Sequence, residues 1–524
     1  MVLIRRSAAR ACTAALAIIV ATACGRAAAD PPPVLVVGVD GAEWSVIERL
    51  WAEGRLPNLH RMADHGAALR LETIHHASPV IWTSIATGVR PQNHGITDFA
   101  VPTAGGDQPA SSTLRRVPAL WNMATAAGRR SAVLGWWATW PAEDINGVMV
   151  SDRALSPLNR RVSPPAFLDR FLAIEAAARA APGGFGGNEA TRIQDQVMSS
   201  TAFELCGEGF DLVLVYLRGI DIACHFDWKY LEPDRFGVLD RAEIAAGRER
   251  IAAAYEAADD AVGALREAIG PAATVLVLSD HGFHAMEREE LRVLLDLDAV
   301  LAELGLLERT KDGVDMARST VHTYASPSHL MAKKVRLCLA GREPGGTVAE
   351  GERPAVRARL ATALARVTWA GGSPAFRLRE PSAKERRGGA DLVVEVLEEG
   401  AAAPLLAGGR PLAGPPPQIS RLSGTHGRTT AGVLLADGPA IAPGAAPAGM
   451  TVLDVAPTIL YAMALPTAES FDGKPRLELF REPFRRHHPP RTIPTWGAPR
   501  DGQGTASAVD QAIIDELAAL GYIQ

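Results

Sequence analysis

Residues 34–41, Val34-Leu-Val-Val-Gly-Val-Asp-Gly41, show the pattern that decides the fold: a short apolar run that ends abruptly at an aspartate. The same pattern returns at Leu212–Leu217, before Asp221, and at residues 275–278, before Asp280 and His281. Runs that are apolar throughout, rich in Val and Leu and only a few residues long, predict strands buried on both faces, as in a parallel sheet.

Helical stretches are expected between these strands, at residues 44–62, 117–127 and 248–269. Alternation of strands and helices predicts an α/β fold with a doubly wound, mostly parallel sheet flanked by helices. Ligands of such sheets bind beyond the carboxyl ends of the strands. A single Asp after a strand is more often a turn or capping residue, but its recurrence after three strands indicates a site.

The chain is long enough for a large core with an insertion. Residues 31–284 and 421–475 are interpreted as the two parts of the core, with a late strand at Gly432–Asp437 and a helix at 452–463. Residues 285–420, with Gly- and Pro-rich segments, a helix at 354–367 and a strand at 391–396, predict an inserted α+β cap subdomain. Residues 476–524 predict an Arg- and Pro-rich tail that ends in an amphipathic helix at 508–520.

The first 30 residues predict an export signal. Arg5 and Arg6 precede a small and apolar run over residues 8–23 and then Cys24, which is the order of a secretory leader. Residues 21–24 resemble a bacterial lipoprotein cleavage box with a lipid anchor at Cys24; cleavage before Asp30 without an anchor is the alternative. We expect an exported protein, periplasmic or lipid-anchored at the cell envelope.

The charge balance excludes binding by bulk electrostatics. Lys and Arg total 54 against 59 Asp and Glu, a net charge of −5, so no basic field attracts nucleic acid as a bulk partner or an anionic membrane. The cysteines beyond the leader are too few for a disulfide scaffold: Cys206, Cys224 and Cys338.

A hydroxyl that could attack phosphorus is found at Ser78. Ser78-Pro79 opens an apolar helical run that ends at Gly88, which predicts a helix with Ser78 as N-cap and Pro79 in its first position. Free N–H groups at a helix N-terminus favour a phosphate. A serine hydroxyl needs a base or a metal to attack at neutral pH, and Asp and His abound at the strand ends, so we favour activation by a metal.

Two catalytic metals would require several Asp and His ligands, because zinc takes three or four carboxylate and imidazole ligands per site. The chain offers six such residues near the predicted strand ends: Asp40, Asp221, His225, Asp280, His281 and His426.

Five motifs in this order resemble the type I phosphodiesterase/nucleotide pyrophosphatase family of the alkaline phosphatase superfamily. They are Val39-Asp40-Gly41, the Ser-Pro-x-x-Trp-Thr-Ser-x-x-Thr-Gly-x-x-Pro-x-x-His-Gly-Ile run from Ser78 to Ile96, Asp221-x-x-x-His225, Ser279-Asp280-His281-Gly282 and Thr425-His426-Gly427. The resemblance covers most of the chain from Val34 to about Gly473. It implies an alkaline-phosphatase-like fold and a two-metal hydrolase of small-molecule phosphate esters.

The resemblance also implies roles for these residues. One Zn²⁺ would be held by Asp40, Asp280 and His281, with Ser78 facing it. The second Zn²⁺ would be held by a separate set: Asp221, His225 and His426. Mn²⁺ is the alternative metal. Ser78 would be the catalytic nucleophile, also bound to metal, and the reaction would pass through a phosphoserine that a water molecule hydrolyses.

The sequence departs from the family at two positions. Members that act on nucleotide diesters commonly have Thr as nucleophile and Asn three positions later, where this chain has Ser78 and Ile81. The ester class therefore stays open among phosphodiester, pyrophosphate and monoester. Alternatives are a phosphonate hydrolase or phospho-group transferase on the same fold, or a non-catalytic metal-binding envelope protein; a sulfatase is disfavoured because Ser78 lacks the expected Pro and Arg spacing.

Overall fold

The computed structural model describes residues 31–507, apart from 104–105, 181–188, 311–312, 324–330, 388 and 415, together with residues 510 and 513. Its largest element is a sheet with the strand order β2-β21-β9-β1-β8-β5-β6-β7. The strands are β1 (Val34–Val39), β2 (Ala67–Leu71), β5 (Ser131–Leu134), β6 (Gly147–Val150), β7 (Val162–Ser163), β8 (Leu212–Leu217), β9 (Thr274–Leu278) and β21 (Gly432–Asp437).

The sheet is mostly parallel, as the sequence predicts. Strand β1 runs parallel to its neighbours β8 and β9, and β5 runs parallel to β8 and β6. Two strands run the other way: β21 is antiparallel to β9 and β2, and β7 is antiparallel to β6. The hydrophobic pattern of a buried strand is the same for both directions, so the sequence did not indicate the direction of β21.

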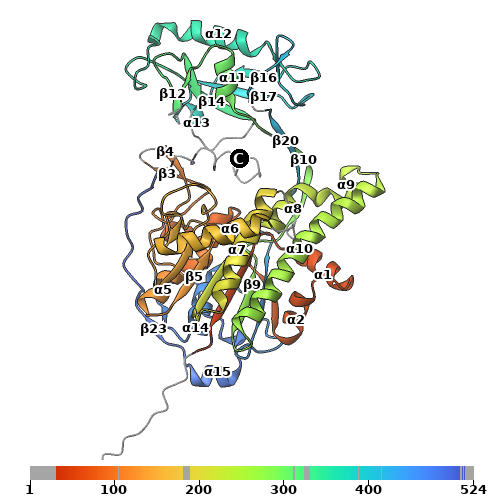
Figure 1. The fold of residues 1–524 in the computed structure, drawn as a ribbon, viewed down its shortest axis with the longest axis vertical. Coiled ribbons are helices and arrows are strands. Elements are labelled where there is room, and N and C mark those ends of the chain that lie inside the picture. Colours follow the sequence, from red (N-terminus) through yellow and green to blue (C-terminus); the bar gives the residue numbers. More distant parts are fainter. Residues whose placement is uncertain are drawn as a thin grey trace, which may run out of the picture. The chain divides into compact units, whose positions relative to one another are not determined.

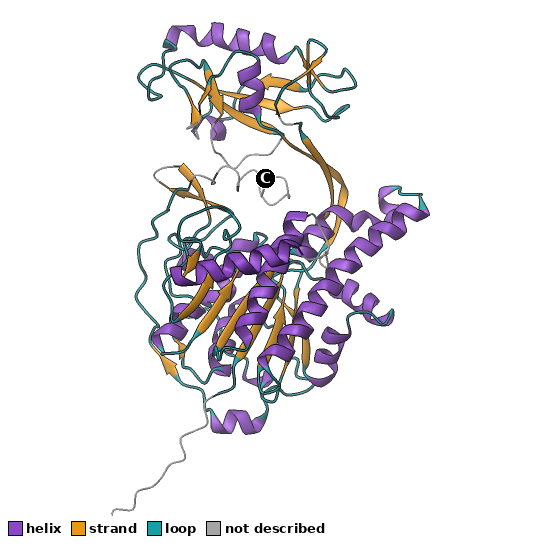
Figure 2. Ribbon diagram, in the orientation of Figure 1, coloured by secondary structure: helices purple, strands orange, loops and turns teal. Residues whose placement is uncertain are grey.

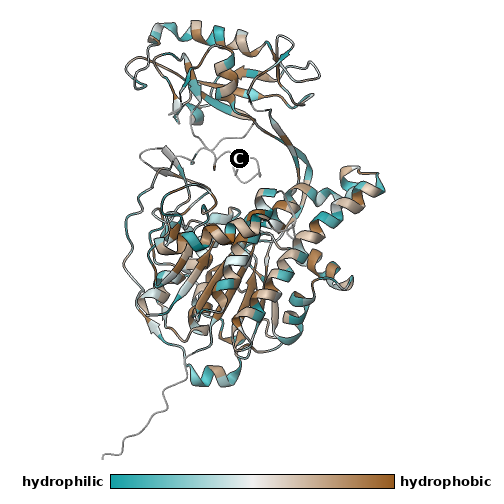
Figure 3. Ribbon diagram, in the orientation of Figure 1, coloured by the Kyte–Doolittle hydropathy of each residue, from teal (hydrophilic) through white to brown (hydrophobic). Residues whose placement is uncertain are grey.

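Helices cover both faces of this sheet (Figure 2). One face packs against α1 (Trp44–Ala52), α2 (Pro57–His65), α6 (Leu168–Ala180), α7 (Glu189–Cys206), α8 (Gly219–Asp227) and α10 (Arg241–Ile269). The other face packs against α3 (Ser78–Thr87), α5 (Leu120–Ala126) and α14 (Val455–Ala462). Hydrophobic residues fill the strands (Figure 3) because alternate side chains of each strand enter the two opposite cores.

Three expected helices differ from the observed ones. The helix expected at 44–62 is two helices, because Gly54 and Leu56 have φ values of 75° and 56° and Pro57 begins the second helix. Helix α10 begins at Arg241, where Asp240 caps it, seven residues before the expected start at 248. The helix expected at 452–463 is a 3-10 turn, η4 (Val452–Asp454), followed by α14.

Strands β10 (His284–Leu294) and β20 (Gln418–Thr425) form an antiparallel ribbon (Figure 1). Between them along the chain lies a four-stranded antiparallel sheet with the order β13-β14-β17-β16. This sheet has its own hydrophobic core with α11 and α12. The bounds are β13 (Val321–Thr323), β14 (Ala332–Leu337), β16 (Phe376–Arg379), β17 (Leu392–Val396), α11 (Leu297–Glu303) and α12 (Arg353–Leu364). The ribbon contains both expected limits of the insertion, 285 and 420.

The remaining elements are short. They are β3 (Ala100–Thr103), α4 (Pro91–His94), β4 (Gly106–Pro109), η1 (Pro165–Phe167), η2 (Trp228–Tyr230), α9 (Pro233–Phe236), β11 (Arg309–Thr310), β12 (Gly313–Val314), η3 (Glu350–Glu352), β15 (Val367–Thr368), α13 (Ala383–Arg387), β18 (Leu406–Ala407), β19 (Arg410–Pro411), β22 (Thr467–Ala468), η5 (Leu477–Leu479), α15 (Glu482–His487) and β23 (Thr492–Ile493).

Two predictions concern residues that the structure does not describe. The export leader with Cys24 lies outside the described residues, and so does most of the helix expected at 508–520. Within the part of the chain that is described, no helix is both long and apolar enough to cross a membrane. The three cysteines beyond the leader are free and buried.

Candidate active site

All six predicted ligand residues lie at one edge of the large sheet. Asp40 follows β1, and Asp280 and His281 follow β9, so the parallel pairing of these two strands brings their ends together. Helix α8 begins directly after β8 and carries Asp221 and His225. His426 precedes β21, whose antiparallel direction places its start at the same edge. The sheet topology therefore gathers residues from four separate parts of the chain.

The first group consists of Asp40, Asp280 and His281. Nε2 of His281 lies 3.4 Å from Oδ1 of Asp40 and 3.4 Å from Oδ2 of Asp280. All three residues are fully buried. One potential ligand atom from each lies within 4.8 Å of the others, a spacing at which a single ion can contact all three.

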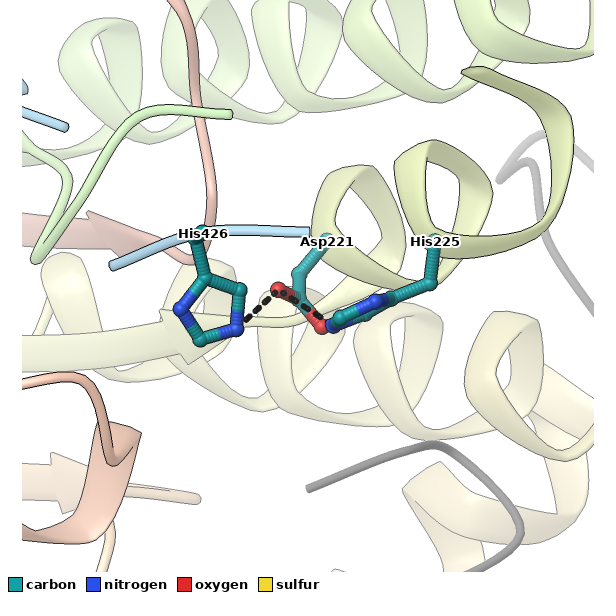
Figure 4. A group of neighbouring side chains, drawn as sticks. All are labelled: Asp221, His225 and His426. Carbon is teal, nitrogen blue, oxygen red and sulfur yellow. Dashed lines mark ion pairs between the residues drawn. The ribbon is translucent and has the colours of Figure 1, made fainter. Parts of the chain in front are cut away.

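The second group consists of Asp221, His225 and His426 (Figure 4). Nε2 of His225 lies 3.5 Å from Oδ1 of Asp221, and Nε2 of His426 lies 4.0 Å from the same oxygen. Asp221 and His225 are four residues apart and therefore share a face of α8. Both imidazoles face the same carboxylate, which again brings three potential ligand atoms together.

Backbone carbonyls orient two of the imidazole rings. Nδ1 of His281 is 3.1 Å from the carbonyl oxygen of Gly282, and Nδ1 of His225 is 3.1 Å from that of Gly424. A proton on Nδ1 donates these bonds and leaves the Nε2 lone pair directed at the carboxylates, which is how outer-shell partners orient metal-binding histidines.

Burial keeps the histidines of both groups neutral. It lowers the pKa of His225 to about 3, and it lowers the pKa of His281 against the opposing effect of Asp40. The pKa of His426 is lowered by burial and by the neighbouring His281 and His225. Neutral imidazole is the form that binds metal.

The first group fits a divalent cation because its own atoms do not satisfy one another. The carboxylates of Asp40 and Asp280 repel each other. Burial and this repulsion raise the pKa of Asp280 well above its ordinary value. Oδ1 of Asp40, Oδ2 of Asp280 and Nε2 of His281 are buried without a hydrogen-bond partner among the described residues. Buried charges of this kind are normally paired or coordinate a metal, and carboxylate with imidazole is a donor set that suits zinc.

The two groups adjoin each other. The rings of His281 and His426 stack with 3.6 Å between their centroids and 6° between their planes. Gly41, directly after Asp40, has φ +70°, and a Cβ added to it would lie 2.9 Å from Cβ of Asp221. Only glycine fits such a close approach at positive φ. Two ions bound here would therefore be neighbours.

Ser78 is the first residue of α3. The expected position was the N-cap, but Ala77 takes that place, so the helix begins one residue earlier than predicted and Pro79 is its second residue. Ser78 is fully buried, and its Oγ has no hydrogen-bond partner among the described residues. One turn later, Nε1 of Trp82 donates to Oδ2 of Asp40 at 3.4 Å, which ties α3 to the first group.

Sequence reasoning missed the residues that hold Asp40. Besides Trp82, the hydroxyl of Tyr216 donates a short hydrogen bond to Oδ2 of Asp40, and Nε1 of Trp137 donates to Tyr216 Oη at 2.8 Å. These bonds leave Oδ1 of Asp40 directed at His281. Tyr216 stands within an apolar strand, where nothing in the local pattern separates it from a core residue.

Three other residues within the five motifs lie outside both groups. Ile81 is fully buried in the core of the α3 face. Cys224 is buried, and its thiol forms a hydrogen bond with the side chain of Tyr255. His94 is structural: its Nε2 is 2.9 Å from Ser84 Oγ, and the Ile96 N–H donates to its Nδ1 at 3.2 Å.

Comparison with known proteins gives one family and several structures. A family model described as type I phosphodiesterase/nucleotide pyrophosphatase matches residues 34–402. The structure of human ectonucleotide pyrophosphatase/phosphodiesterase 5 is 16% identical, with a TM-score of 0.41 over 86% of this chain and 100% of that chain. Its murine counterpart, solved as an inactive variant in complex with AMP, is 16% identical, with a TM-score of 0.41 and the same coverage. Among curated protein sequences, none gives a significant match.

Proposed function

The chain belongs to the type I phosphodiesterase/nucleotide pyrophosphatase family, and from this premise we propose that it hydrolyses phosphate esters with Ser78 as nucleophile between two metal ions. One observation carries the proposal. Two buried Asp/His groups adjoin each other at the carboxyl edge of the sheet, and a tryptophan from the helix that begins with Ser78 bonds one of them.

Each group would hold one divalent cation. Asp40, Asp280 and His281 would hold the first, and the second would be held by Asp221, His225 and His426. Zinc fits these donors best, with Mn²⁺ as the alternative. Such ions, when bound, lower the pKa of a nearby hydroxyl or water and neutralise charge on phosphoryl oxygens.

The chain's own residues would then carry out the ester exchange. Ser78 Oγ would lose its proton and bond to phosphorus as the bond to the leaving group breaks, and the leaving oxygen would take up a proton. The N-terminus of α3 favours the negative charge of the phosphoryl group. Water would cleave the resulting phosphoserine and restore the Ser78 hydroxyl. The orientation of Asp40 by Tyr216 and Trp82 keeps the first group in place during both steps.

We propose hydrolysis of phosphate esters in general rather than of nucleotides in particular. Ile81 is buried in the core and has no polar atom to offer a phosphoryl oxygen. Phosphodiester, pyrophosphate and monoester substrates are therefore all included. The leader with Arg5, Arg6 and Cys24 further supports an exported enzyme, periplasmic or lipid-anchored.

Metal content and ester hydrolysis of the purified protein test this proposal. The assay would use p-nitrophenyl phosphate and bis(p-nitrophenyl) phosphate with wild type and Ser78→Ala. The matched control is Ser131→Ala. Ser131 is likewise fully buried, and its Oγ also lacks a hydrogen-bond partner among the described residues, but it begins β5 at the opposite edge of the sheet.

We expect two metal ions per chain in all three proteins and a rate loss on the order of 10⁴-fold or more in Ser78→Ala alone, as for other nucleophile deletions. The better ester identifies the substrate class. A wild-type protein that binds metal but cleaves neither ester would overturn hydrolysis of simple phosphate monoesters and diesters. Equal rates for wild type and Ser78→Ala would overturn the assignment of the nucleophile.

A further inference from the structure

A buried aspartate outside both groups holds the helix that carries two of the proposed ligands. Asp195 lies in α7 and is 1% exposed. Its Oδ1 accepts the N–H of Arg218 at 3.0 Å, and its Oδ2 accepts the N–H of Gly219 at 2.7 Å. They belong to the N-cap residue and the first residue of α8, whose N-cap side chain makes no capping bond. Asp195 therefore caps α8 from another helix.

The capped turn is the one that bears Asp221. Asp221 is the third residue of α8, and His225 follows one turn later. Unsatisfied N–H groups fray the first turn of a helix, and a carboxylate beside them is favoured by the helix dipole. A change at Asp195 would thus reach the second group through the backbone, without contact between Asp195 and a metal.

We propose that Asp195 is a positioning residue that fixes Asp221, and with it the second metal site. The inference rests on the proposed function, because it assumes that the second group binds a metal. It differs from a role in stability alone in one respect: loss of the cap must weaken the second site while leaving the first site intact.

The chain contains a matched control for this distinction. Asp259 in α10 is also 1% exposed, and it caps α2 from another helix in the same way. It accepts the N–H of Asn58 at 3.1 Å and that of Leu59 at 2.7 Å, and it also accepts the side-chain amide of Asn58 at 2.9 Å. Helix α2 carries none of the six proposed ligands. Both aspartates therefore make similar capping contacts, but only one of them caps a helix with ligands.

The experiment compares Asp195→Asn with Asp259→Asn in the full-length protein. Asparagine keeps the shape but presents an NH₂ group to one of the two N–H donors, so both caps lose a bond. The readouts are metal content by elemental analysis, zinc affinity by competition with a chromophoric chelator, and thermal stability of the metal-free protein. Burial raises the pKa of Asp195 to about 7, so the titrations belong well above that pH, where the wild-type residue is charged.

We expect both variants to lose similar thermal stability, and only Asp195→Asn to bind one of its two zinc ions, the one at the second site, about 10–100-fold less tightly, the usual cost of removing a supporting contact. Equal zinc affinities in the two variants would overturn the inference and leave the proposed function untouched. A wild type that binds fewer than two zinc ions would instead overturn the proposed function, and the inference with it.

A second pair of variants covers the case in which Asp195→Asn does not fold. Serine at either position keeps one acceptor oxygen and removes the buried charge, so Asp195→Ser and Asp259→Ser are compared in the same titration. We expect the same selective loss at the second site in Asp195→Ser. An unchanged affinity in this variant would overturn the inference.

Discussion

The two Asp/His groups are built on different supports. Asp40, Asp280 and His281 follow two central strands that pair in register along their length. Asp221 and His225 stand on a helix, and His426 follows a ribbon strand whose other end leads into residues 285–420. The side chains of the first group are fully buried, whereas that of His426 is 8% exposed.

The two supports should differ in rigidity. A paired central strand fixes the residue that follows it, since moving that residue disrupts the sheet. The second group depends on the docking of α8 and on the turn after β20, and neither is part of the sheet. We therefore expect the first site to be preformed and the second to be the weaker and more easily perturbed site.

The largest effect should come from removing one ligand of each group. Asp280→Asn should lose the first metal and slow ester hydrolysis by on the order of 10⁴-fold or more, because Ser78 loses its activation. His426→Gln should lose only the second metal and slow hydrolysis by roughly 10²–10³-fold, the cost of a lost charge-stabilising contact. Elemental analysis measures the metal loss, and hydrolysis of the preferred ester measures the rate loss.

A control for these ligand variants is Asp437→Asn. Asp437 is a buried aspartate at the other end of β21, where it pairs with Arg266. This variant should keep both metals. If His426→Gln lost both metals and as much activity as Asp280→Asn, the two groups would be one cooperative site, and the contrast drawn above would be wrong.

The sequence was sufficient to predict the large sheet. All six positions of β1 and of β8 are buried, and apart from Gly38 and Tyr216 they carry purely aliphatic side chains. The sequence also placed an acidic residue after each of β1 and β9, and parallel pairing brings such residues together. That Asp280 and His281 approach Asp40 therefore follows from strand order. Their assignment as metal ligands stays a prediction.

The sequence was insufficient where long-range packing decides. His426 reaches the site only because β21 is antiparallel. The direction of a strand cannot be predicted from an apolar run. Tyr216 shares a buried face of β8 with Leu212 and Leu214, so its bond to Asp40 could not be inferred. Asp195 was missed for a similar reason, since a single acidic residue in a helix is typical of an exposed face.

Substitution of either of two glycines should change zinc affinity by a smaller factor, and the two substitutions should affect the two groups differently. A Cβ at Gly424 would lie 2.2 Å from the carbonyl oxygen of Cys224, so Gly424→Ala must push the ribbon strand away from α8. Gly424 also supplies the carbonyl that orients His225. We expect zinc affinity at the second site alone to fall by about 10–100-fold.

Gly41→Ala is the counterpart, since Gly41 lies between the groups. Alanine at φ +70° is strained by roughly 1–2 kcal/mol, and its Cβ would press on Asp221 while the strain displaces Asp40. Both zinc affinities should fall in a chelator titration. A Gly41→Ala protein that weakened only one site would show that Asp40 and Asp221 move independently.

The last comparison concerns acid stability, for which His94 supplies a baseline that belongs to neither group; changing His94 should have the smallest effect on metal binding. Burial lowers the pKa of His94 from 6.5 to about 3. Between these values the unfolded chain binds a proton that the folded chain does not. The contribution of neutral His94 to folding stability is therefore fully present above pH 6.5 and is lost as the pH falls, by about 1.4 kcal/mol per pH unit. His94→Gln should flatten this loss in denaturant titrations at successive pH values.

The flattening should be the same with and without a chelator, because His94 bonds Ser84 and Ile96 rather than either group. Acid sensitivity that a chelator adds on top of this baseline would then belong to the histidines of the two groups. If the flattening itself changed with the chelator, His94 would be coupled to the metals through α3, and the separation of the two supports would be less complete than the geometry indicates.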